Sequence, residues 1–108
     1  MSPELEQPLT INVHREGAEA TLTLQGELDP HTAPMLADEI DGSVHDGATT
    51  VVLVLTGLGF VDSAGLRVII SADRALSEQG GRLVLRAPSD NVRRLLEITG
   101  LLDHLHTD

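Results

Sequence analysis

Hydrophobic and polar residues alternate near the start of the chain, which is the pattern of strands with one buried face. Leu9, Ile11 and Val13 would share one face of a first strand, and residues 20–25 repeat the alternation after the turn signal Glu16-Gly17. We therefore predict an antiparallel hairpin. Residues 1–8 hold two prolines and two glutamates and are expected to form a flexible leader. A single domain is expected over residues 9–105.

Three segments show apolar residues at helical spacing. Asp29 followed by Pro30 is typical of an N-cap with proline at the first helical position, and Asp46-Gly47 would end that first helix. A second helix is predicted over residues 63–79, with Gly80-Gly81 after it. A third is predicted from Ser89, its expected cap, to Gly100. Three leucines would dock a last short helical turn: Leu101, Leu102 and Leu105.

Two further strands lie between these helices. Residues 50–55 form a continuous apolar run, which suits a strand covered on both faces, and Gly57 and Gly59 predict a tight loop after it. Residues 82–87 predict another strand. The order β-β-α-β-α-β-α predicts an α/β fold: a small mixed sheet of about four strands, with an N-terminal antiparallel hairpin and a parallel, right-handed βαβ unit, covered by three to four helices.

Composition narrows the possible functions. The 108 residues include no cysteine and no lysine, and 17 acidic residues against seven arginines give a net charge of −10. Disulfides, thiolate nucleophiles and lysine-based phosphate loops are excluded. Phe60 is the one aromatic residue, so nucleic acid and anionic membranes are poor partners. We expect a protein partner, a monomer when free, and a reducing, cytoplasmic location.

The junction between the third strand and the second helix carries the candidate chemistry. Ser63 stands at a helix N-terminus that follows a buried strand, where free N–H groups and the helix dipole favour a phosphate. A phosphate there would be accepted on the helix's own N–H groups without a change of fold. From position alone, a plain capping role for Asp62 or Ser63 is the favoured alternative.

Two motifs carry a family resemblance. Residues 26–32 (Gly-Glu-Leu-Asp-Pro-His-Thr) and 60–66 (Phe-Val-Asp-Ser-Ala-Gly-Leu) resemble the STAS-domain anti-sigma factor antagonists of bacteria. The likeness runs from about Leu9 to Leu105 and includes Gly80-Gly81 and the later Val92, Leu95 and Gly100-Leu101 pattern. It implies the fold predicted above.

The resemblance also implies a function that is regulatory and not enzymatic, without a cofactor or a metal. Such a protein binds an anti-sigma factor that is a serine kinase with an ATPase fold, and the sigma factor is released for transcription. The kinase phosphorylates the motif serine, here Ser63, and the phosphorylated antagonist dissociates from it. A PP2C-type phosphatase then removes the phosphate. The partner-binding residues that the two motifs imply would be Asp29, Asp62, Ser63, Ala64 and Gly65, and the spacing along the second helix adds Arg67, Ser71 and Arg74 as candidates.

The chain departs from the family pattern at two positions. Ala64 stands where a second Ser or Thr is frequent, so Ser63 is the sole acceptor in the motif. Arg67 stands where a small glycine is frequent. With Ser71, Arg74 and Glu78 it forms an exposed stripe, which is either an ordinary solvated helix face or a docking ridge for the partner.

Three other readings compete with this one. The domain could be an accessory or scaffold subunit of a transport or signalling complex. Ser63 could be the nucleophile of a small serine hydrolase, with His104 or His106 as base and Asp90 or Asp103 orienting it. The two histidines also invite a metal reading, although an exposed tail is the favoured interpretation.

Overall fold

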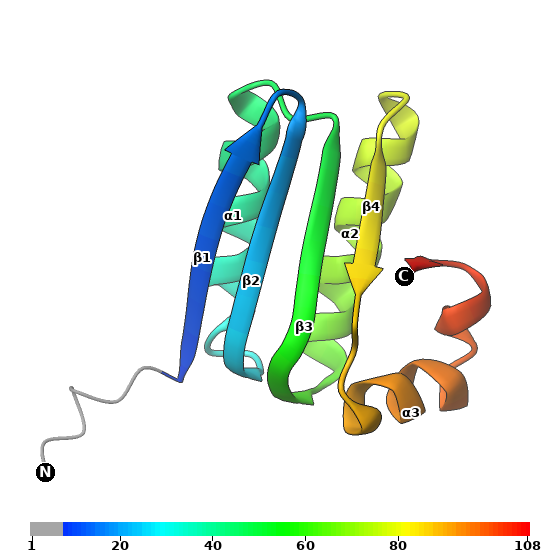
Figure 1. Ribbon diagram of the computed structural model, residues 1–108. Coiled ribbons are helices and arrows are strands. Elements are labelled where there is room, and N and C mark those ends of the chain that lie inside the picture. Colours follow the sequence, from blue (N-terminus) through cyan, green and yellow to red (C-terminus); the bar gives the residue numbers. More distant parts are fainter. Residues whose placement is uncertain (1–7) are drawn as a thin grey trace, which may run out of the picture.

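Five strands form one mixed sheet in the order β1-β2-β3-β4-β5 (Figure 1). In the computed structural model, which describes residues 8–108, the strands are β1 (Leu9–Glu16), β2 (Glu19–Leu28), β3 (Thr50–Val61), β4 (Arg82–Arg86) and β5 (His106–Thr107). β1 and β2 form the predicted antiparallel hairpin, and the other neighbours are parallel. The two-residue β5 has no pattern in the sequence and was not predicted.

Most of the predicted leader, residues 1–7, lies outside the described residues. Pro8, its last residue, is bound to the sheet because its carbonyl oxygen accepts a hydrogen bond of 2.8 Å from the amide of Glu27. Beside that bond, Gly26 has a φ of +119°, and a Cβ there would lie 2.2 Å from the same oxygen. Glycine is therefore required where the chain enters the sheet.

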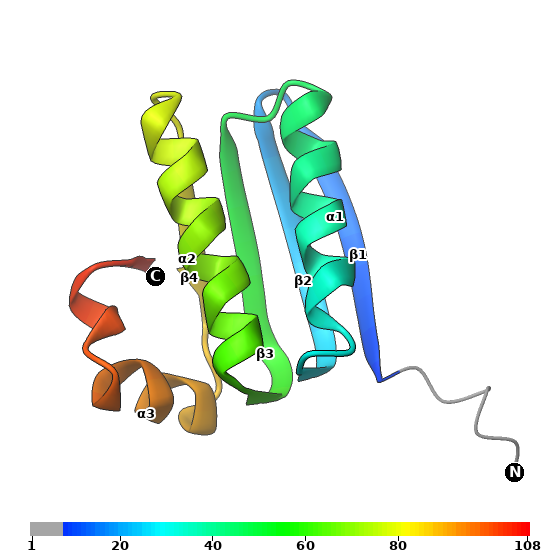
Figure 2. The ribbon, with the colours of Figure 1, turned by 180° about the vertical axis from the view of Figure 1, so that it is seen from behind.

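Two long helices lie side by side on one face of the sheet (Figure 2). They are α1 (Ala33–His45) and α2 (Ser63–Glu78), and the second matches its predicted range to within one residue. α3 (Asp90–Ile98) lies beyond the end of β4, followed by a 3-10 turn over Leu101–Asp103. No helix within residues 8–108 is both long and apolar enough to cross a membrane.

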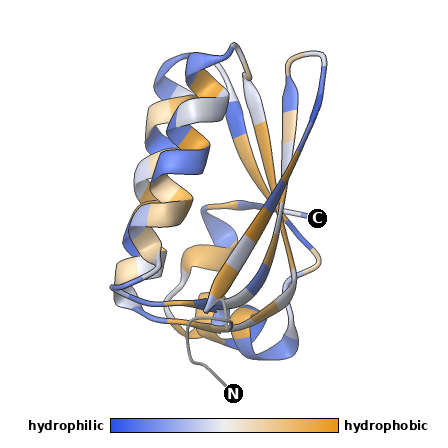
Figure 3. Cartoon of the chain, turned by 90° about the vertical axis from the view of Figure 1, so that its left-hand side faces the viewer, coloured by the Kyte–Doolittle hydropathy of each residue, from blue (hydrophilic) through white to orange (hydrophobic). Residues whose placement is uncertain are grey.

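The hydrophobic core fills the space between the sheet and these helices (Figure 3). Ala20, Leu22 and Leu24 of β2 are fully buried, as are Leu53 and Leu55 of β3. The opposite face of the sheet carries Thr21, Thr23, Val54 and Val84, which are half-buried, and Val52, which is only 1% exposed; no long helix covers this face. Helices therefore cover β3 on one face only, although Val52 is buried on the other.

β3 is also longer than predicted. It continues through Gly57 and Gly59 to Val61, so the predicted tight loop is wrong. Its pairing with β2 is irregular here, with register shifts on either side of the pair Gln25 and Gly57. A Cβ at residue 57 would lie 2.8 Å from the Gln25 side chain and 3.0 Å from the carbonyl oxygen of Leu24. Gly57 permits a close approach of the two strands, and neither glycine ends β3.

α1 begins three residues later than predicted. Its N-cap is Thr32 and not Asp29, and Pro34 stands in its first turn. Asp29 instead closes the turn before the helix, where its Oδ1 accepts hydrogen bonds from the amides of His31 and Thr32. Proline at position 30 fits that turn as well as it fits a helix start, so the dipeptide alone does not separate the two.

Candidate functional site

The candidate site lies where β2 and β3 leave the sheet at the same edge. Leu28 pairs with Val61 at the last position of the two strands, and the amide of Asp62 donates to the carbonyl oxygen of Leu28 at 3.0 Å. Asp29 and Asp62 therefore begin neighbouring connections, each leading into a helix on the same face of the sheet. The structure brings together the two motifs that lie about 30 residues apart in the sequence.

Asp62 caps α2. Its backbone is extended, and its Oδ1 accepts hydrogen bonds from the amides of Ala64 at 2.9 Å and Gly65 at 3.1 Å. The amide of Leu66 donates to the carbonyl oxygen of Asp62. The expectation that a phosphate on Ser63 is received on the helix's own N–H groups stays a prediction: in the unphosphorylated chain the Asp62 carboxylate already occupies two of those donors, the amides of Ala64 and Gly65.

Ser63 is the first residue of α2 and is exposed, whereas the two residues after it are progressively covered. Ala64 is half-buried and Gly65 is buried. A Cβ at residue 65 would lie 2.7 Å from the side chain of Leu28 and 3.1 Å from that of Val61. Gly65 therefore sets the distance between α2 and the strand ends, and Ser63 is exposed at the start of the helix, as is Phe60 earlier in the motif.

Asp29 is held by the turn that precedes α1. The amides of Thr32 and His31 donate to its carboxylate and lower the pKa of Asp29 below its ordinary value. The carboxylate is therefore charged at neutral pH. It contributes a fixed negative charge at the edge of the sheet where Ser63 is exposed.

Thr32 organises this turn, and sequence reasoning missed it. Thr32 is fully buried; its hydroxyl donates to the carbonyl oxygen of Glu27 at 2.8 Å, and its Oγ1 accepts a hydrogen bond from the amide of Asp29 at 2.9 Å. The sequence Asp29-Pro30-His31-Thr32 was the available local signal, because Asp and Thr side chains commonly bond to the backbone of a turn that contains proline.

The stripe predicted on α2 is present and exposed. Arg67, Ser71 and Arg74 are all exposed, and together with Ser63 they border a shallow hollow of about 340 Å³ whose floor includes Leu66 and Ile70. The stripe starts one helical turn from Ser63, as its spacing predicted. The structure thus joins the motif serine and the stripe in one continuous surface.

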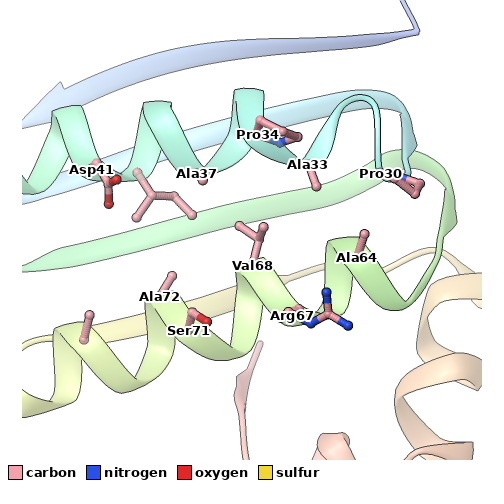
Figure 4. A pocket seen from close by; sticks show the side chains of 12 residues that line it. Pro30, Ala33, Pro34, Ala37, Asp41, Ala64, Arg67, Val68, Ser71 and Ala72 are labelled. Carbon is pink, nitrogen blue, oxygen red and sulfur yellow. The ribbon is translucent and has the colours of Figure 1, made fainter.

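A groove between α1 and α2 was not predicted. It has a volume of about 700 Å³ and is lined mainly by small apolar side chains (Figure 4). Ala33 and Ala37 line it from α1, and Ala64 and Val68 from α2. Arg67 borders both this groove and the hollow beside Ser63. No period in the sequence signals it, because it depends on how the two helices are spaced.

The structure separates Ser63 from His106, one of the two histidines named for the hydrolase alternative. β5 places His106 opposite Val84, which lies opposite Val52 in β3. Ser63 follows the far end of β3, so roughly nine strand residues at about 3.3 Å each separate His106 from it. Within residues 8–108 no three His, Asp or Glu side chains gather as a metal site either.

Comparisons with known proteins agree with this geometry. The model of the STAS domain family matches residues 10–108. An anti-sigma-B factor antagonist of Staphylococcus aureus is 34% identical over 83 residues, which are 77% of each chain. The structure of the anti-sigma factor antagonist SpoIIAA in its unphosphorylated form aligns with a TM-score of 0.79 at 25% identity, over 92% of this chain and 88% of that one. The phosphorylated form of the Bacillus protein SpoIIAA shares the fold, with a TM-score of 0.73 at 24% identity over 92% and 91%.

Proposed function

The chain belongs to the STAS domain family. We propose that it is an anti-sigma factor antagonist whose affinity for its partner is controlled by phosphorylation of Ser63. The observation that carries this proposal is the exposed Ser63 at the start of a capped helix, beside the turn that holds Asp29. The partner is an anti-sigma factor that also acts as the serine kinase, and a PP2C-type phosphatase removes the phosphate. The exchange takes place in the cytoplasm.

The electrostatics of the site explain why one phosphate is enough. A phosphoserine adds about −1.5 to −2 charges at neutral pH. It would join the carboxylates of Asp62 and Asp29 at one edge of a chain whose net charge is −10. A hundredfold loss of affinity corresponds to about 2.7 kcal/mol, which one desolvated and poorly paired charge in an interface supplies.

Binding and release then need no refolding. The serine side chain is exposed, and two of the donors at the start of α2, the amides of Ala64 and Gly65, are already engaged by Asp62. Phosphorylation therefore changes the charge of this surface, while the Asp62 cap keeps the backbone at the start of α2 in place. Partner residues that contact Ser63 would extend onto the stripe of Arg67, Ser71 and Arg74, which adjoins it.

The proposal is tested by a pull-down with four baits: wild type, Ser63→Ala, Ser63→Asp and Ser71→Asp, with bound proteins identified by mass spectrometry. We expect wild type and Ser63→Ala to recover an ATPase-fold serine kinase and Ser63→Asp to lose it. Ser71→Asp adds the same charge two turns along the helix, within the stripe, and separates sensitivity at Ser63 from sensitivity of the whole stripe.

The outcomes separate the alternatives. Recovery of the same partners by all four baits would contradict control by charge at Ser63 and would favour a constitutive scaffold or accessory subunit. Loss of the kinase from both acidic variants would place the sensitivity on the whole stripe and not on Ser63. Incubation of the purified pair with ATP should label Ser63, and labelling elsewhere would contradict its role as acceptor.

A further inference from the structure

Ser63 and Arg67 are four residues apart on α2 and face the same hollow. Both are exposed, and both border the space of about 340 Å³ beside the start of the helix. Residues separated by four positions lie on one helix face within reach of each other's side chains. An anion that precedes a cation at this spacing is the favourable order, because it also matches the helix dipole.

A phosphate on Ser63 finds two of the donors of the helix start already engaged. The amides of Ala64 and Gly65 donate to the Asp62 carboxylate. The phosphate would have to displace a carboxylate of the same charge to use these two amides. A side-chain cation within reach would add the compensation that they do not supply.

Arg67 is the cation placed to supply it. The connection that holds Ser63 and the neighbouring connection after β2 each begin with an acidic residue, Asp62 and Asp29. Arg74, the other arginine at the hollow, is eleven residues from Ser63 and so about three turns away. Arg86 and Asp108 form the one ion pair found within residues 8–108, so no carboxylate of this part of the chain lies within ion-pair distance of Arg67.

We propose that Arg67 pairs with the phosphate on Ser63. The inference rests on the proposed function, since it concerns the phosphorylated state of that same site. Arg67 also lines the groove between α1 and α2, at the level of Ala64 (Figure 4). Pairing therefore takes a cation away from the surface that the partner would contact, at the same moment as the phosphate adds negative charge to it.

The test measures the second ionisation of the phosphoserine by ³¹P NMR at low salt. Phosphoserine is incorporated at position 63 during translation and verified by intact mass, in wild type, Arg67→Gln and Arg74→Gln. An i, i+4 pair lowers the phosphate pKa, so Arg67→Gln should raise it by about 0.2–0.4 pH units. Arg74→Gln removes the same charge and should leave it within about 0.1 pH units of wild type.

Equal phosphate pKa values in wild type and Arg67→Gln would overturn the proposal, as would equal changes in both variants. A second readout is the Arg67 Nε–H resonance, which should shift on phosphorylation while that of Arg74 does not. Failure of the kinase to modify Ser63 would refute the proposed function and leave this measurement intact, because the phosphoserine is installed without the kinase. Normal phosphorylation of Ser63 by the kinase, together with equal phosphate pKa values in wild type and Arg67→Gln, would refute only the pairing of Arg67 with the phosphate.

Discussion

The amide of Asp62 donates a hydrogen bond to the carbonyl oxygen of Leu28, 3.0 Å away, and this contact fixes the start of α2 to the end of β2. It extends the sheet pairing by one step beyond the last strand pair, Leu28 and Val61. The residues that follow on each side belong to the two conspicuous motifs of the sequence. The relative position of these motifs is thus set by backbone hydrogen bonding, and the exposed side chains are left available for recognition.

Removal of the helix cap should weaken the fold measurably. We expect Asp62→Ala to lower the free energy of unfolding by about 1–2 kcal/mol, because the amides of Ala64 and Gly65 lose their acceptor. Urea unfolding measures the change. Ser63→Ala is the control, since an exposed side chain should change stability by less than about 0.5 kcal/mol. Equal effects of the two substitutions would contradict the capping role.

Two glycines in helices should respond in opposite directions to alanine. Gly65→Ala places a Cβ 2.7 Å from Leu28, so overpacking of about 1–3 kcal/mol should exceed the gain in helix propensity. Gly42→Ala in α1 meets no atom within 4 Å and should stabilise by about 0.5–1 kcal/mol. Thermal unfolding of both variants decides the matter. A stabilised Gly65→Ala would show that α2 can move away from the strand ends at little cost.

The buried hydroxyl of Thr32 should contribute measurably to the free energy of unfolding. Thr32→Val keeps the shape but leaves the carbonyl of Glu27 and the amide of Asp29 without a partner, which should cost about 1–3 kcal/mol. Chemical unfolding would measure it. Thr23→Val, on the helix-free face of β2, is the matched control and should stay within about 0.5 kcal/mol of wild type. Similar losses at both positions would argue against the hydrogen bonds of Thr32 as the cause.

Asp29 should make stability depend on pH in the acid range. Its pKa is lowered in the folded protein by the amides of Thr32 and His31, so the unfolded chain binds a proton more readily. The stabilisation from this carboxylate is therefore complete above the unfolded pKa of about 3.9 and is lost as the pH falls through the folded pKa. The stability difference between wild type and Asp29→Asn should shrink from pH 6 to pH 3. A difference that is constant over this range would contradict the assignment.

The sequence predicted those parts of the fold that depend on local pattern. The hairpin follows from alternation between Leu9 and Gln25, and α2 follows from its apolar spacing and from Gly80, whose φ of +80° ends the helix. The motif serine was also located correctly at the exposed start of that helix. In these segments one face is buried and the other is not, so the pattern records the environment directly.

The errors lie where a contact from another part of the chain decides the outcome. Gly57 and Gly59 are turn residues by local preference, but pairing with β2 keeps them in a strand. Ser89 is the N-cap of α3, as predicted, but its hydroxyl donates to the carbonyl oxygen of Leu58 and makes no capping bond to its own helix. The groove between the helices is likewise a tertiary feature, whereas the cap that Asp62 forms on α2 is local and was among the sequence alternatives. A single sequence contains no record of those partners.

The strand order has a consequence for what this fold can recognise. The chain passes from β2 to β5 in one direction, and each of the two crossovers through α1 and α2 returns on the same face of the sheet. In nucleotide-binding sheets the order reverses at one point, and the two neighbouring connections diverge there to open a crevice for a cofactor. Here the order never reverses, so the connections after β2 and β3 lie side by side and form a continuous surface at the end of the sheet. Such a surface suits contact with another folded protein, which would distinguish it by the charge and size of a few exposed side chains.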